Sequence, residues 1–116
     1  LMVAGPQSVS GSTNFPRAIE TGVDWLTDLL LHAREQGATR VEASQQGQEE
    51  WVEEVVRAHE KLLLRGSKGW FTGYNSNVAG HQEGQIRYQA YFGGVPKYMR
   101  RINQETADGY PGIELR

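Results

Sequence analysis

The stretch NFPRAIETGVDWLTDLLLHAREQG, residues 14–37, is the strongest fold signal in the sequence. Apolar residues recur in it at steps of three and four, which places them on one face of a helix. That face holds Ile19, Val23, Leu26, Leu30 and Ala33. Asn14 suits the N-cap, Pro16 the first turn and Gly37 the C-terminal stop. We therefore predict a helix of about six turns whose apolar face is buried.

A second helix is predicted from about Gln48 to Leu64, ended by Gly66. Its apolar face holds Trp51, Val55, Ala58 and Leu62. Its first turns carry the carboxylates Glu49, Glu50, Glu53 and Glu54, which suit the positive end of a helix. Such a run of acids is more often a solvated helix face than an acid–base pair, so we assign it no catalytic role.

The remaining segments predict short strands around one more helix. Arg40–Ser44 suggests a brief extended segment, and the short apolar run Leu1–Gly5 reads as the end of a buried strand cut from something longer. Ile86–Phe92 alternates in β-favouring side chains as a strand does. Val95–Asp108 is predicted to form a short helix, and Gly112–Leu115 a terminal strand. The predicted fold is α+β, with two longer amphipathic helices and a C-terminal strand-helix-strand unit.

Composition limits the possible partners. The 116 residues, 38% of them hydrophobic, allow one compact domain, and a net charge of -2 with interspersed signs provides no broad basic face. We therefore expect no nucleic acid and no membrane partner. The chain has no cysteine, which excludes disulfides and thiolate chemistry and is consistent with a reducing compartment. We expect a cytoplasmic protein.

Several residues of reactive types lack the spacing that their chemistry needs. His32, His59 and His81 show no paired metal-ligand spacing, so we predict no metal site and interpret each as a surface or helix-end histidine. The serines of the first loop lack a G-x-S-x-G elbow, and Gly93-Gly94 reads as a tight turn before a helix rather than a phosphate loop. No catalytic residue is predicted.

Two features are better candidates for ligand binding. A loop of small residues leads into the helix start at Asn14 and Phe15, where backbone N–H groups and the helix dipole favour an electron-rich group. Trp70 lies in a glycine-rich loop, residues 66–84, and its ring and N–H suit a cofactor. Ordinary helix capping and ordinary anchoring of a loop by an aromatic ring remain the alternatives at these two places.

Taken in order, these segments resemble the C-terminal portion of flavin-dependent Baeyer-Villiger monooxygenases of the cyclic or aromatic ketone type. The resemblance rests on Ala4-Gly5-Pro6, the serine-rich loop, Asn14, Ile19-Glu20, Val23-Asp24-Trp25, Trp70-Phe71-Thr72-Gly73, Asn75, Gly93-Gly94 and the stretch from Gly109 to Leu115. It spans nearly the whole chain. The loop from Asn75 to Gly84 is longer and looks closer to the subgroup that acts on large cyclic or steroid-like ketones.

The resemblance implies a parent enzyme that uses FAD, NADPH and oxygen to insert one oxygen atom beside a ketone carbonyl, giving an ester or lactone. It also implies roles for individual residues. Cofactor contacts fall on Asn14 and Phe15, near the flavin, and on Trp70, which would hydrogen-bond NADP from a mobile lid; the ketone pocket falls on Gly11, Ser12, Thr13 and Phe15.

The resemblance divides the chain into residues 1–36, the end of an FAD-binding domain, and residues 37–116, a C-terminal segment that carries the lid loop 66–84. Both dinucleotide-binding motifs and the active-site arginine of the family have no counterpart here. We therefore expect the isolated chain to be inert, to bind no cofactor, and to self-associate through the uncovered face of its long helix. The alternative is a free-standing α+β interaction or dimerisation domain without a cofactor.

Overall fold

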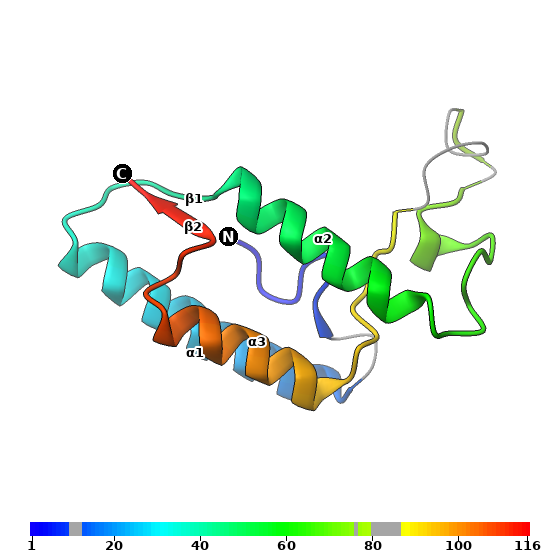
Figure 1. Ribbon diagram of the computed structural model, residues 1–116, viewed down its shortest axis with the longest axis horizontal. Helices are drawn as coiled ribbons and strands as arrows, with labels where there is room; N and C mark the ends of the chain where they lie inside the picture. The colour runs from blue at the N-terminus through cyan, green and yellow to red at the C-terminus, as the bar shows by residue number, and fades with distance from the viewer. Residues whose placement is uncertain (10–12, 76, 80–86) are drawn as a thin grey trace.

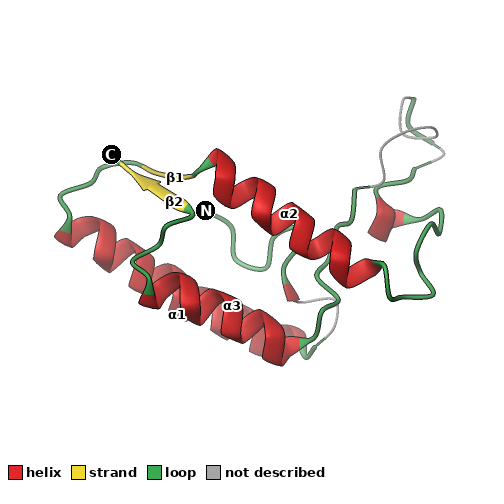
Figure 2. Cartoon of the chain, in the orientation of Figure 1, coloured by secondary structure: helices red, strands yellow, loops and turns green. Residues whose placement is uncertain are grey.

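The computed structural model describes residues 1–9, 13–75, 77–79 and 87–116, and it is a small α+β arrangement dominated by helices (Figure 2). Its elements, in chain order, are helix α1 (Phe15–Glu35), strand β1 (Val41–Ala43), helix α2 (Gln45–His59), the 3-10 turn η2 (Trp70–Thr72), helix α3 (Val95–Ala107) and strand β2 (Ile113–Leu115). The α+β class predicted from the sequence is confirmed.

The long helix α1 forms with the predicted ends. It has 21 residues, and the Asn14 side chain accepts a hydrogen bond from the Arg17 N–H at 3.3 Å. At the other end Gly37 adopts a φ of 71°, which glycine reaches without the steric cost of a Cβ. Both ends depend on local sequence, because each end is formed by residues that lie within about one turn of it.

The buried face of α1 is rotated from the predicted one. Its buried residues are Ala18, Leu29 and Ala33, whereas Val23 and Leu30 are 45% and 50% exposed. The prediction that all five apolar positions are buried is therefore wrong. The half-buried Trp25 links this helix to α3, because it donates its indole N–H to the Ile102 carbonyl at 3.2 Å.

Helix α2 starts and ends earlier than predicted. Ser44 is its N-cap, and the Ser44 hydroxyl accepts the Gly47 N–H at 3.0 Å. The four glutamates consequently lie beyond the first turn, which holds no acidic residue. The helix ends at His59, and Gly66, with a φ of 74°, ends a series of turns after it rather than the helix. The predicted apolar face is confirmed at its centre, where Val55 is fully buried.

The two strands form an antiparallel pair in which Glu42 lies opposite Glu114. Two like charges in register destabilise a strand pair. Arg116 offsets this repulsion because its guanidinium forms ion pairs with both carboxylates. The predictions of short strands near residues 40–44 and 112–115 are confirmed in this pair.

Two other predicted strands are wrong. Residues 87–92 are extended but form no strand, so the C-terminal unit is a helix and a strand with an extended lead-in. Their hydrogen-bond partners lie on irregular segments on either side, which gives no continuous ladder. Leu1 to Val3 also form no strand and are exposed. A segment forms a strand only when it pairs with a neighbouring strand, and neither of these two segments has such a neighbour among the described residues.

The helices are arranged around the N-terminal segment. In Figure 1, α1 and α3 lie together on one side, α2 lies on the other, and the first residues of the chain run between them. The core joins these parts through Val9, Ala18, Val55, Tyr88 and Tyr91, with the Trp51 ring stacked on Tyr91 at 5.2 Å. None of the helices among the described residues has the length and apolar character to cross a membrane.

Candidate functional site

The start of α1 leaves two backbone donors available. The Asn14 side chain takes the Arg17 N–H, and the Asn14 carbonyl takes the Ala18 N–H at 3.1 Å. Pro16 has no N–H. Within the described residues, the N–H groups of Asn14 and Phe15 therefore have no partner, and no acidic residue lies in the first turn to neutralise the helix dipole. This arrangement can accept an electron-rich group.

The predicted ketone-pocket residues are only partly visible at this helix start. Gly11 and Ser12 lie outside the described residues. Thr13 is half-buried beside Asn14, and the Phe15 side chain is 54% exposed. Thr13, Asn14 and Phe15 are consecutive, so the described parts of the predicted flavin and ketone sites are neighbours by sequence alone.

Trp70 lies elsewhere, in a turn that projects beyond the end of α2 (Figure 1). Its side chain is 72% exposed, and its ring packs edge-on against Phe71 with the centroids 5.2 Å apart. The buried Thr72 closes the turn, because its hydroxyl lies 2.6 Å from the Ser67 carbonyl oxygen and accepts the Gly69 N–H at 3.3 Å. A well-formed turn thus presents an exposed indole ring.

The prediction that His59 is a surface or helix-end histidine is confirmed for the helix end and wrong for the surface. His59 lies at the end of α2 but is 1% exposed, and its ring stacks on Tyr88 with the centroids 3.8 Å apart. Its Nδ1 is 3.0 Å from the Val55 carbonyl oxygen, and Nε2 has no partner in the described part of the chain. Across those same residues, no group of three or more possible ligands could hold a metal ion.

A cavity of about 490 Å³ lies between the N-terminal segment and the three helices. Trp25, Trp51 and Tyr98 contribute to its largely apolar wall. Of the binding residues predicted from the sequence, those that the structure describes, Thr13, Asn14, Phe15 and Trp70, do not line it. This cavity was not predictable from sequence patterns, because its walls come from segments far apart in the chain.

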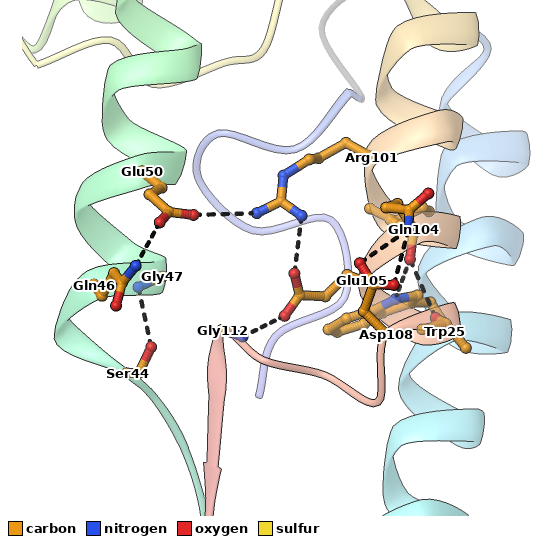
Figure 3. Close-up of polar contacts among 12 residues, drawn as sticks. Trp25, Ser44, Gln46, Gly47, Glu50, Arg101, Gln104, Glu105, Asp108 and Gly112 are labelled. Carbon is orange, nitrogen blue, oxygen red and sulfur yellow. Dashed lines mark hydrogen bonds and ion pairs between the residues drawn. The ribbon is translucent and has the colours of Figure 1, made fainter.

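One wall of the cavity is an ionic network, drawn in Figure 3. The buried Glu105 carboxylate accepts the Gly112 N–H at 2.6 Å and a guanidinium N–H of Arg101 at 2.8 Å. The other guanidinium nitrogen of Arg101 is 3.8 Å from Glu50. The network joins α3 to α2 and to the approach of β2. Because its charges pair with each other, it supports the fold rather than offering an unpaired charge to a ligand.

Known proteins match this chain over nearly its whole length. No family model matches the chain. The cyclopentanone 1,2-monooxygenase of Comamonas sp. is 31% identical over 96% of this chain and 19% of the relative. The FAD-binding monooxygenase VdtE of Byssochlamys spectabilis is 27% identical over 97% of this chain and 19% of its own length.

The structure of cyclohexanone monooxygenase from Rhodococcus sp. Phi1 bound to NADP+ superposes with a TM-score of 0.80 and 30% identity, over 99% of this chain and 20% of that protein. The homologues of this chain are Baeyer-Villiger monooxygenases. The resemblance read from the sequence is thereby confirmed. The chain spans about a fifth of the length of the Baeyer-Villiger monooxygenases that it matches.

Proposed function

We propose that this chain is the C-terminal part of an FAD- and NADPH-dependent Baeyer-Villiger monooxygenase that inserts oxygen beside a ketone carbonyl to give an ester or lactone. Relatives with such activities match nearly the whole chain, and one is named as FAD-binding. The observation that carries the proposal is the start of α1, where the Asn14 and Phe15 N–H groups lack partners among the described residues. The parent is a flavoprotein with two dinucleotide-binding domains.

The helix start fits a flavin ring in its donor chemistry. When bound, FAD supplies the oxidation chemistry and NADPH the reducing electrons. The residues of this chain supply two N–H donors and the positive end of a six-turn dipole, which together stabilise negative charge on a reduced flavin. Thr13 and Phe15, beside these donors, contribute to the ketone pocket, as do Gly11 and Ser12 from outside the described residues.

Trp70 fits a lid over the nicotinamide cofactor. Its ring is exposed, and its indole N–H has no acceptor among the described residues. An exposed indole ring offers a flat face for stacking and one N–H donor, which suit a nicotinamide ring and its amide. We propose that NADP covers it when the lid is closed.

The isolated chain lacks what a flavoprotein needs, since it contains no G-x-G-x-x-G motif for a dinucleotide. We propose that it is inert alone. The test is titration of the purified chain with FAD, followed by visible absorbance and equilibrium dialysis. We expect free FAD only, and tight stoichiometric binding would overturn the proposal of inertness.

The activity itself is tested in a complete protein that carries this chain. Purified with FAD, it should oxidise NADPH and convert a cyclic ketone to its lactone. Trp70→Ala should lower NADPH affinity and lactone yield while FAD stays bound. Trp70→Phe keeps an aromatic ring but removes the N–H donor, so it separates stacking from hydrogen bonding. Lactone yield unchanged in both variants would contradict the lid role.

A further inference from the structure

The extended segment from Arg87 to Tyr91 lies between the N-terminal loop and the Trp70 turn. On one edge, the Gln89 carbonyl accepts the Gln7 N–H at 2.7 Å, and the Tyr91 N–H donates to the Ser8 carbonyl at 3.0 Å. On the other edge, the Arg87 N–H donates to Thr72 at 3.0 Å and the Gln89 N–H to Phe71 at 2.9 Å. One peptide segment therefore connects two loops that the sequence separates widely.

Gln7 makes this connection at an unusual backbone conformation. Its φ is 62°, in the left-handed region that a glutamine rarely adopts. Its side-chain amide donates to the Tyr88 carbonyl at 3.2 Å, next to the Gln89 carbonyl that its backbone N–H reaches. Two hydrogen bonds from one residue thus fix the N-terminal loop on residues 88 and 89. A non-glycine residue persists in this region only when its surroundings hold it there.

The other edge of the segment is equally fixed. Thr72 and Phe71, which accept the Arg87 and Gln89 N–H groups, belong to the same turn as Trp70. Phe71 also packs against Phe92 with the ring centroids 5.6 Å apart, so the turn touches the segment through side chains as well as backbone. A shift of residues 87–91 must therefore move the Trp70 turn, the N-terminal loop, or both.

We propose that Gln7 is a positioning residue that couples the N-terminal loop leading to Thr13 and Asn14 with the turn that carries Trp70. The coupling runs through the backbone of residues 87–91. This inference rests on the proposed function for its consequence, which is that the ketone-side loop and the cofactor lid set each other's position. The mechanical coupling itself rests only on the hydrogen bonds and conformations described above.

The test variant is Gln7→Asn in the complete FAD-loaded protein. Asparagine tolerates a positive φ better than other side chains do, but it is one methylene too short to keep the bond to Tyr88. Gln104→Ala is the matched control, because it removes a side-chain amide that donates within α3, to the Asp108 carboxylate at 2.9 Å. Gln7→Gly is the second variant if Gln7→Asn fails to fold, since glycine also suits the conformation.

Hydrogen–deuterium exchange is the readout that does not depend on activity. The amides of Thr72, Gly73 and Tyr74 are hydrogen-bonded within the Trp70 turn. Gln7→Asn should speed their exchange by roughly three- to tenfold, the value of about one hydrogen bond, although the substitution lies on the other side of the segment. Gln104→Ala should leave it unchanged. Faster exchange confined to the N-terminal loop, or equal changes in both variants, would overturn the coupling.

Kinetics then separate this inference from the proposed function. If the two elements are coupled, Gln7→Asn should raise the KM for ketone and for NADPH together, and combining it with Trp70→Ala should give less than the product of the single effects. Independent, multiplicative effects would overturn the inference while leaving the oxygenase activity intact. A wild-type protein that oxidises no ketone would instead reject the proposed function, whatever the exchange data show.

Discussion

Asn14 caps helix α1, because its side chain accepts the Arg17 N–H. The proposed role of its backbone N–H as a donor to a ligand is separate from this capping role. Asn14→Ala removes only the cap and should destabilise the chain by about 1 kcal/mol in urea unfolding. Asn14→Asp keeps a capping oxygen and should retain stability. If both variants unfold at the same urea concentration as the wild type, the cap does not contribute to stability.

The Tyr91 hydroxyl predicts a loss of stability at alkaline pH. Burial, with a hydrogen bond to Glu54 at 3.2 Å, raises the pKa of Tyr91 to about 12 from 10.0. A raised pKa means that the folded state keeps the proton more tightly than the unfolded one. This contribution is present below pH 10 and is lost as the pH rises toward 12. In Tyr91→Phe, unfolding measured at several pH values should show a smaller loss over that range; an identical loss would contradict the assignment.

The same carboxylate acts in the opposite pH range. Burial alone would raise the pKa of Glu54, but hydrogen bonds from Lys97 and Tyr91 outweigh it and hold the pKa below its ordinary value of 4.5. Its stabilising effect is therefore present above that value and is lost as the pH falls through the lowered pKa. Glu54→Gln should flatten the acid side of the stability profile, and an unchanged slope would contradict this.

Residue-scale features were predictable when their cause was local. Asn14 and Gly37 were identified correctly because a cap depends on neighbours within one turn. His59 and Glu105 were not, because their burial depends on Tyr88 and Gly112, which lie far away or across a turn. Polar residues on a helix normally read as solvent-exposed, and only tertiary contacts reverse that.

At the scale of elements, the existence of the helices was predictable and their orientation was not. The 3.6-residue period located α1 and the centre of α2, but Ala18 and Gly22 carried too little hydrophobicity to mark the inward face, where Ala18 joins the core and Gly22 faces Val3 and Ala4. Residues 87–92 have strand-like alternation, yet their partners are loops. The binding role of Trp70 is also a prediction that depends on resemblance, since its turn shows only exposure.

The contact between α2 and the C-terminal strand predicts an inverted glycine effect. Within a helix, Gly→Ala ordinarily stabilises by about 1 kcal/mol. A Cβ on Gly47, however, would lie 2.6 Å from the Gly112 Cα and 2.7 Å from its carbonyl oxygen. Because backbone atoms cannot rotate away, Gly47→Ala should destabilise by about 1–3 kcal/mol in urea unfolding. Gly69→Ala, whose Cβ meets no atom within 4 Å, is the control. A stabilised Gly47→Ala chain would show that this contact is loose.

At the scale of the whole molecule, the exposed side of α1 indicates a surface made for contact. Phe15, Val23 and Leu30 are exposed and lie with Ile19 and Leu26 along one face of the helix. A contiguous apolar stripe of this kind marks an interface in most proteins. The chain spans about a fifth of the length of its relatives, so we propose the rest of a parent oxygenase as one occupant of this face and a second copy of the chain as the alternative.

These two occupants make different predictions for one substitution. In the isolated chain, the uncovered stripe should drive association at high concentration, and Leu30→Glu should restore the mass of a single chain in light scattering, because a charge cannot be buried unpaired. Leu63→Glu changes a fully exposed leucine outside α1 and should not affect the mass. In a complete oxygenase, Leu30→Glu should instead lower thermal stability and weaken FAD retention without changing the oligomeric state. A wild-type chain that stays at one-chain mass would reject association, and a complete protein unaffected by Leu30→Glu would show that the rest of the parent does not cover this face.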